Sequence, residues 1–143
     1  MGNYLYTFKK EKMTAVIIGR FQVPKLHPGH LYIIGESLQL FDKVVILLGT
    51  TTTKDERNPY GMFQRTEMIR KVFPHVQIDV VIDNQSDERW SIDIDTIVGT
   101  LKVGDPILVH SRDSFKDHYS GVYPLHELPE LPGYSGTELR KQT

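Results

Sequence analysis

The chain contains no cysteine, so disulfide bonds, zinc–thiolate sites and thiol nucleophiles are excluded for its 143 residues. Its formal net charge is only −1, which argues against a protein that binds nucleic acid through bulk electrostatics. The sequence also shows no signal peptide, no long uncharged apolar segment, no internal repeat and no low-complexity tract. We therefore expect a cytoplasmic protein with no membrane partner, folded as one domain over residues 1–143, with residues 1–12 as an N-terminal extension.

Short apolar runs alternate with segments typical of helices. The runs expected to be strands are Ala15–Ile18, Val44–Leu48, Val76–Ile82, Ile107–His110 and the weaker Val122–Leu125. Helices are expected at 29–41, 62–73 and 88–101, with a short one near Ser114–His118. The central runs are continuous, as in parallel strands that are buried on both faces. This order predicts an α/β fold with a doubly wound parallel sheet, and the alternating Tyr4–Phe8 is a candidate extra edge strand.

The most informative segment lies between the first expected strand and the first expected helix. It reads Gly19-Arg20-Phe21-Gln22-Val23-Pro24-Lys25-Leu26-His27-Pro28-Gly29-His30. At a helix start, free backbone N–H groups and the helix dipole favour a phosphate. Imidazoles add donors that can follow charge as it develops on phosphoryl oxygens. Because ligands in such folds bind at the carboxyl ends of strands, the segment indicates a nucleotide-phosphate site; the alternative is a pair of capping or surface histidines.

A second motif lies near the other end of the chain. It reads Ser135-Gly136-Thr137-Glu138-Leu139-Arg140 and is introduced by Pro132-Gly133-Tyr134. Ser135 and Glu138 have the spacing of a capping box, so one interpretation is simply a well-capped helix. The same arrangement also presents two hydroxyl groups, free N–H groups and the guanidinium of Arg140, whose planar fork suits phosphate oxygens. As a partner of the first motif, it favours a second phosphate-binding helix start.

Taken together, these motifs resemble those of the nucleotidylyltransferase superfamily that is named after its HIGH-type signature. The resemblance spans Thr14 to Arg140 and includes Arg57-Asn58-Pro59-Tyr60 with Arg65-Thr66-Glu67-Met68-Ile69. This middle stretch is similar to one found in archaeal-type nicotinamide mononucleotide adenylyltransferases and their bacterial and phage relatives. The resemblance implies a Rossmann-like fold and an enzyme that transfers AMP from ATP to nicotinamide mononucleotide, giving NAD and pyrophosphate.

The resemblance also implies roles for residues of the two end motifs. The catalytic residues would be His27, His30 and Arg140, with His30 as the donor toward the α-phosphate. Contacts to ATP and its phosphates would come from Gly19, Arg20, Phe21, Gly29, Arg112, Ser135, Gly136 and Thr137. Magnesium would be held by the substrate phosphates and not by protein carboxylates. The loop before the histidines is longer than is usual in the family, and we expect it to displace His27 while His30 stays on the helix.

The acceptor side of the implied site centres on Trp90, the only tryptophan. It resembles the tryptophan that stacks on the nicotinamide ring in the archaeal-type enzymes, and a π-face suits a cationic pyridinium. The alternative is an ordinary packing residue. The implied nicotinamide-nucleotide site is completed by Asn58, Arg65, Asp83 and Asn84.

Two other functions remain open. One is a sister enzyme that transfers CMP or AMP to another phosphorylated small molecule, such as a phosphocholine- or pantetheine-type acceptor; Trp90 and Asn58 argue against it. The other is a catalytically silent module that senses nucleotides, against which the two histidines argue. ATP and nicotinamide mononucleotide are the expected partners, and a homo-oligomer remains open. The chain ends three residues after Arg140, so a compact enzyme, a fragment and an adenine pocket completed by a neighbouring subunit also remain open.

Overall fold

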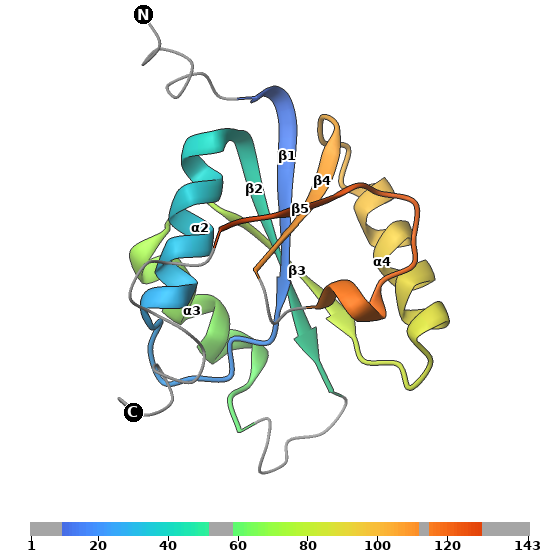
Figure 1. Cartoon of the computed structure of the whole chain (residues 1–143). Coiled ribbons are helices and arrows are strands. Elements are labelled where there is room, and N and C mark those ends of the chain that lie inside the picture. Colours follow the sequence, from blue (N-terminus) through green and yellow to red (C-terminus); the bar gives the residue numbers. More distant parts are fainter. Residues whose placement is uncertain (1–9, 52–58, 112–114, 130–143) are drawn as a thin grey trace, which may run out of the picture.

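The computed structural model describes residues 10–51, 59–111 and 115–129 (Figure 1). The strands are β1 (Lys10–Gly19), β2 (Phe41–Thr50), β3 (Gln77–Ile82), β4 (Pro106–His110) and β5 (Leu125–Glu127). The helices are α2 (Pro28–Leu40), α3 (Met62–Val72) and α4 (Asp87–Thr100), with the short 3-10 helix η1 (Phe115–His118). Among these described residues, no helix has the length and apolar character needed to cross a membrane.

The five strands form one parallel sheet in the order β3-β2-β1-β4-β5. The chain runs outward from β1 through β2 to β3, and then crosses back to β4 on the other side of β1. As a result, α2 and α3 cover one face of the sheet, and α4 with η1 covers the other, as Figure 1 shows. This is the doubly wound α/β arrangement that the sequence predicts.

Side chains of the central strands alternate between two hydrophobic clusters, one on each face of the sheet. In β1, Ala15 and Ile17 pack on the side of α2 and α3, whereas Val16 packs on the side of α4. In β4, Val109 packs on the side of α2 and α3, and Leu108 packs on the side of α4. Each of these side chains is at most 2% exposed. Burial on both faces therefore explains why the strands appear in the sequence as continuous apolar runs.

The last strand corrects one prediction. The apolar run Val122–Leu125 predicts a strand, but β5 begins only at Leu125. The N–H of Val122 donates to Oδ2 of Asp95 at 3.0 Å, and the N–H of Tyr123 donates to the hydroxyl of Tyr119 at 3.0 Å. Because these two N–H groups are bound by side chains, the segment forms a turn against α4 before it joins the sheet.

The first strand is longer than predicted. β1 begins at Lys10, inside the expected N-terminal extension, and pairs there with Phe41. Phe41 also starts β2 directly after α2 ends at Leu40, so no loop separates this helix from its strand. The observed ends of α3, α4, β3 and β4 lie within one residue of the predicted ones. The candidate edge strand Tyr4–Phe8 lies outside the described residues.

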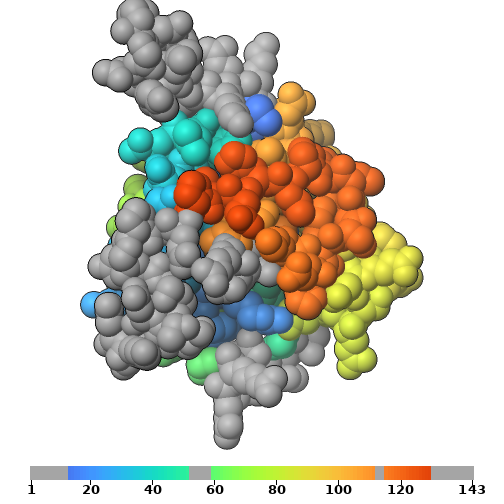
Figure 2. All heavy atoms as spheres, viewed as in Figure 1, coloured from blue at the N-terminus to red at the C-terminus, as the bar shows by residue number. Residues whose placement is uncertain are grey.

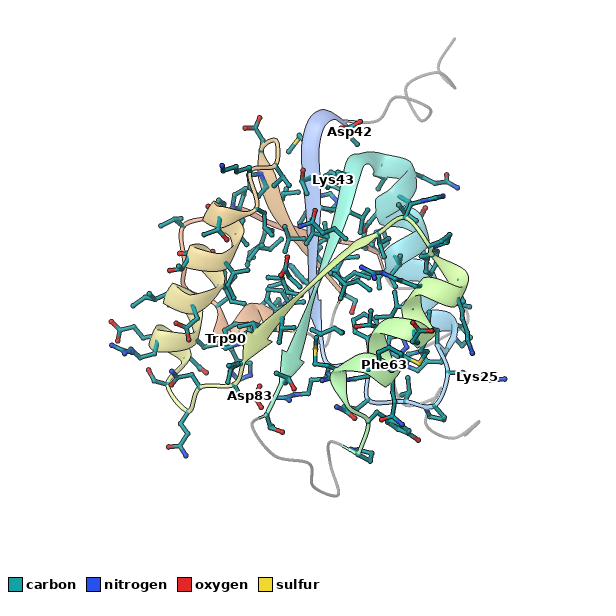
Figure 3. The ribbon with its side chains drawn as sticks, turned by 180° about the vertical axis from the view of Figure 1, so that it is seen from behind. Lys25, Asp42, Lys43, Phe63, Asp83 and Trp90 are labelled. Atoms are coloured by element: carbon teal, nitrogen blue, oxygen red, sulfur yellow. The ribbon has the colours of Figure 1, made fainter. Side chains whose placement is uncertain are left out.

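The carboxyl ends of the strands and the N-termini of the helices gather at one edge of the molecule. Figure 3 shows Asp83 and Trp90 at this edge, whereas Asp42 and Lys43 lie at the opposite end, where β2 begins. On the face seen in Figure 2, β5 and the residues that follow it, in red, lie beside α2 in cyan, whereas η1, in orange, lies on the side of α4 in yellow. Residues that follow β1 and β3 are therefore brought to the same edge despite their separation in sequence.

The two faces of α4 provide a test of this packing. Ile94 is fully buried against the sheet, so Ile94→Ala should lower the free energy of unfolding by roughly 2–5 kcal/mol. Ile92, on the same helix, is 53% exposed, and Ile92→Ala should change the free energy of unfolding by no more than about 0.5 kcal/mol. Urea denaturation of both variants measures the difference. Equal losses would contradict the assignment of the helix face.

Candidate functional site

The candidate site lies where β1 and β4 end. These strands are neighbours in the sheet, but β1 continues into α2 on one face and β4 continues into η1 on the other. In doubly wound sheets a crevice opens at such a point, and ligands bind there at the carboxyl ends of the strands. Gly19 ends β1 and His110 ends β4. The motif Gly19–His30 that the sequence singles out therefore begins at this switch point of the sheet.

The two histidines of the motif lie together at the start of α2. His27 is the N-cap residue, Pro28 takes the first helical position, and His30 lies in the first turn. The rings of His27 and His30 stack with their centroids 3.6 Å apart and their planes at 17°. Nδ1 of His27 is buried and has no hydrogen-bond partner among the residues that the structure describes. Leaving such an atom unpaired costs about 1–3 kcal/mol, which favours a ligand that bonds to it.

Both imidazoles are neutral at pH 7. Burial, and secondarily the neighbouring His27, lowers the pKa of His30 to about 4. Burial also lowers the pKa of His27. The backbone N–H of His27 donates to Nδ1 of His30 at 3.4 Å, which assigns the proton of the neutral ring to Nε2. His30 therefore offers an N–H donor without carrying a positive charge.

Phe21 forms a wall beside His30. Its backbone φ is 53°, in the left-handed region that costs a non-glycine residue about 1–2 kcal/mol. The ring is only 6% exposed, and its centroid lies 4.8 Å from that of His30. A Cβ atom at Gly19 would lie 2.9 Å from Cε2 of Phe21, so only glycine leaves room for the ring there. Gly19 and Phe21, both predicted as phosphate contacts, are thus packed as supports of the histidine pair.

Arg20 and Asp83 form an ion pair across the ends of β1 and β3. Nη2 of Arg20 lies 2.6 Å from Oδ1 of Asp83. The side chains are 48% and 32% exposed, so solvent screening limits the contribution of the pair to stability to about 0–1 kcal/mol. Its main effect is to orient two side chains that the sequence places on different sides of the site, Arg20 with the phosphates and Asp83 with the nicotinamide nucleotide.

Gln22 is a residue to which the sequence assigns no role, although it belongs to the first motif. Its Nε2 donates to the carbonyl of Tyr60 at 3.0 Å, and its Oε1 accepts from the N–H of Tyr60 at 2.9 Å. This double contact attaches the loop after β1 to the segment just before α3. The partners are 38 residues apart in sequence, so no local pattern could have indicated the pairing.

His110 is a second residue that the sequence analysis does not single out as a site candidate. It is 4% exposed, it ends β4 at the same switch point, and its Nδ1 lies 3.0 Å from the carbonyl oxygen of Ser111. The sequence feature that could have indicated His110 as a site residue is its position as the polar last residue of a strand that is otherwise apolar.

Arg65 lies in α3 and is 1% exposed. The structure thus places this predicted acceptor-side residue beneath the surface, where its guanidinium bonds to the protein. Its Nη1 donates to the carbonyl oxygens of Arg20 and Gly49 at 2.8 and 2.7 Å, and its Nη2 donates to Oγ1 of Thr50 at 3.1 Å. Arg65 therefore connects α3 to the carboxyl ends of β1 and β2.

Trp90 and Asn84 lie at the start of α4. Trp90 is partly buried, with its ring centroid 6.3 Å from that of Phe115, and it lies at the same edge as Asp83 in Figure 3. Oδ1 of Asn84 accepts from the N–H of Ser86, whose hydroxyl in turn caps the helix. Asn84 thus helps to set the direction in which α4 begins, and through it the position of Trp90.

The other predicted site residues lie outside the described part of the chain: Asn58, Arg112, Ser135, Gly136, Thr137 and Arg140. Their roles stay predictions. Within residues 10–51, 59–111 and 115–129, no group of three or more histidine or acidic side chains is placed to hold a metal ion.

The chain is similar to known nucleotide-handling proteins over most of its length. A solved structure of a bifunctional NMN adenylyltransferase/ADP-ribose pyrophosphatase from Francisella tularensis, in complex with AMP and a manganese ion, matches 90% of the chain with 26% identity and a TM-score of 0.69. The match covers 40% of that protein, so the present chain spans less than half of its length.

Two structures of the NadR protein, one with NR and one with NAD and AMP-PNP, match 84% and 85% of the chain, each with a TM-score of 0.62. These matches cover 38% and 39% of the NadR chains. At 12% identity they show a shared fold only. No significant match was found among curated protein sequences.

The family assignment comes from the sequence itself. The model of the family described as cytidylyltransferase-like matches residues 16–142, which include both histidines and the Ser135–Arg140 motif. The fold and the order of the motifs agree with this match. The chain is therefore a member of the cytidylyltransferase-like family, within the HIGH-motif nucleotidylyltransferase superfamily.

Proposed function

We propose that this chain transfers AMP from ATP to nicotinamide mononucleotide, giving NAD and pyrophosphate. The observation that carries the proposal is the stacked pair His27 and His30, neutral at pH 7, at the N-terminus of α2 and at the switch point of the sheet. The choice of substrates is supported by the similarity to the Francisella adenylyltransferase and by the motifs around Arg65 and Trp90. Because the chain spans 40% of that relative, the activity is proposed for the unit that the two share.

The reaction asks the protein to align two polyanions and to stabilise moving charge. A 5′-phosphate oxygen of the acceptor attacks the α-phosphorus of ATP; the new P–O bond forms as the bond to the β-phosphate bridging oxygen breaks, and pyrophosphate leaves. Protein side chains need not form a covalent intermediate. Catalysis then rests on positioning and on donors aimed at the phosphoryl oxygens.

His30 has the properties that such a donor needs. Its Nδ1 is occupied by the backbone N–H of His27, so Nε2–H is the end of the ring that can reach a ligand. The ring is neutral before substrate binds, and its donor bond strengthens as negative charge grows on the α-phosphate oxygens. The free N–H groups of the first turn of α2 add further donors, and Gly29 keeps that turn free of a side chain.

The leaving pyrophosphate would be held by Ser135, Gly136, Thr137 and Arg140, with Arg112 near the ATP phosphates. These assignments rest on the sequence motifs. An arginine with two hydroxyl groups at a helix start suits the β- and γ-phosphates, because a guanidinium can bond to two oxygens at once.

A divalent cation fits this site through oxygens that the substrate brings. No described cluster of acidic side chains could coordinate it alone, and Asp83 is paired with Arg20. When bound, the ion neutralises charge on the phosphates. We propose that the ATP phosphates hold magnesium there, in line with its preference for oxygen ligands.

On the acceptor side, we propose that Trp90 stacks on the nicotinamide ring. Its place in the first turn of α4, next to the end of β3, puts an aromatic face at the carboxyl edge of the sheet. Asp83 and Asn84 lie between the end of β3 and the start of α4, and they would contact the ribose or carboxamide. Asp83 keeps one carboxylate oxygen beyond its contact with Arg20, and this second oxygen can accept from a ribose hydroxyl.

The substrate assignment is tested by incubating the protein with ATP, magnesium and nicotinamide mononucleotide, and separating the products by chromatography. We expect equal amounts of NAD and pyrophosphate. Parallel reactions with CTP, and with phosphocholine or a pantetheine phosphate as acceptor, cover the sister reactions of the family. If NAD is absent and CTP gives a product, the proposed substrates are wrong and only the family assignment stands. Tight binding of NAD without any turnover would favour a sensing module.

His30→Ala tests the role of the imidazole in the reaction. Removing one preorganised donor of this kind should lower kcat by roughly 100-fold or more, with a smaller effect on KM for ATP. His75→Ala is the matched control, because His75 is exposed and lies just before β3, at the edge of the sheet away from the site. Steady-state kinetics of both variants gives the comparison, and a normal kcat for His30→Ala would reduce the motif to a structural role.

Trp90 tests the acceptor side separately. If its ring stacks on the nicotinamide, nicotinamide mononucleotide should quench the single tryptophan fluorescence, and ATP should change it much less. Trp90→Ala should raise KM for nicotinamide mononucleotide with little change for ATP, the pattern of lost uniform binding to one substrate. Trp90→Phe, which keeps an aromatic face, should recover part of the loss. Equal effects on both substrates would return Trp90 to a packing role against Phe115.

A further inference from the structure

The guanidinium of Arg65 is the most deeply buried charged group among the described residues, with 1% of the residue exposed. Burying a charge is costly unless hydrogen bonds satisfy it. Arg65 meets this requirement with carbonyl oxygens of Arg20 and Gly49, the hydroxyl of Thr50, and a longer contact from Nε to the carbonyl of Gly61. The acceptors come from the ends of β1 and β2 and from the start of α3, so one side chain holds three segments at the edge of the site.

The bond to the Arg20 carbonyl has a consequence for the next residue. This carbonyl belongs to the peptide unit that leads into Phe21, whose φ is 53°. Holding the carbonyl fixes the plane of that peptide and so restrains the left-handed turn. The turn in turn directs the Phe21 ring into the space beside Gly19 and against the imidazole of His30.

A second contact from the same region supports this restraint. The amide of Gln22 bonds to both backbone groups of Tyr60, immediately before α3. Phe21 is therefore held on each side in sequence, at Arg20 by Arg65 and at Gln22 by Tyr60. Both attachments lead back to the N-terminal part of α3.

We propose that Arg65 is a positioning residue, which holds the Arg20 carbonyl and thereby keeps Phe21 against His30, fixing the imidazole for the transfer. The inference rests on the proposed function for its catalytic consequence, but its structural part does not. Direct contact of Arg65 with a substrate would require its guanidinium to leave several protein acceptors and its buried position.

The test uses Arg65→Lys, which keeps the positive charge but replaces the planar fork by a single ammonium group. Without the fork, the strand ends lose part of their shared support, and the Phe21 ring is freed from His30. The pKa of His30, followed by NMR of the imidazole, should then rise from about 4 toward its ordinary value of 6.5. In the same variant kcat should fall roughly 10- to 100-fold, as expected for a misplaced catalytic group, while KM for nicotinamide mononucleotide changes little.

Two further variants make the test specific. Ile69→Val, on the same helix, removes a buried methyl group but leaves the hydrogen bonds of Arg65 in place, and it should leave both the pKa of His30 and kcat unchanged. Phe21→Leu removes the ring that covers His30 while Arg65 stays in place, and it should raise the pKa of His30 as Arg65→Lys does. Phe21→Leu also keeps the inference testable if Arg65→Lys fails to fold.

The outcomes separate this inference from the proposed function. If the wild type forms no NAD but the pKa of His30 still rises in Arg65→Lys, the substrate assignment fails and the positioning stands. An active wild type with an unchanged pKa and kcat in Arg65→Lys overturns the positioning alone. A raised KM for nicotinamide mononucleotide with unchanged kcat and pKa would overturn it in favour of direct substrate contact. An unchanged pKa of His30 in Phe21→Leu would contradict the proposed effect of the Phe21 ring on His30.

Discussion

The buried guanidinium of Arg65 needs hydrogen-bond acceptors, and in this fold the ends of β1 and β2 supply them. Carbonyl groups at the ends of parallel strands are attractive partners, because strand pairing no longer uses all of them once the strands diverge. The same requirement brings α3 close to the loop after β1, where Gln22 and Tyr60 also meet. The loop is thus held by directed bonds to buried or backbone groups, and the exposed pair of Arg20 and Asp83 adds orientation to it with little stability.

Most of the fold could be predicted from the sequence, because burial on both faces leaves a clear pattern in a parallel strand. Ala15–Ile18, Val44–Leu48 and Ile107–His110 are apolar runs of this kind, and the structure places them in the three central strands. The predicted start of the last strand at Val122 was wrong for a physical reason. Valine is a residue type that favours strands, but the N–H of Val122 donates to Asp95 of α4. A side-chain acceptor 27 residues away competes with the sheet there, and apolar periodicity does not report it.

The spatial arrangement of the candidate site residues was predictable where they are close in sequence and less so where they are not. His27 and His30 are three residues apart across a helix start, so local geometry was enough to bring them together. The pairing of Arg20 with Asp83 joins residues 63 positions apart and depends on β1 and β3 ending at the same edge. Arg65 could also be predicted only in part. Its motif gives the residue type, but it does not tell whether the guanidinium points to a ligand or into the protein.

In the proposed function, the histidine pair would bind a polyanion without carrying net charge of its own. Two imidazoles stacked at 3.6 Å repel each other if both are protonated, and burial adds to the cost, so the free site keeps them neutral. A neutral N–H donor is directional, and it discriminates between correctly and incorrectly placed oxygens better than a diffuse positive potential does. Binding of a phosphate beside His30 would favour its protonated form and raise its pKa, which strengthens the donor as charge accumulates on the transferred group. In the proposed reaction, the Phe21 ring would serve both conditions: it packs against the free imidazole and adds to its burial, and it would help to keep Nε2 directed at the place where the charge develops.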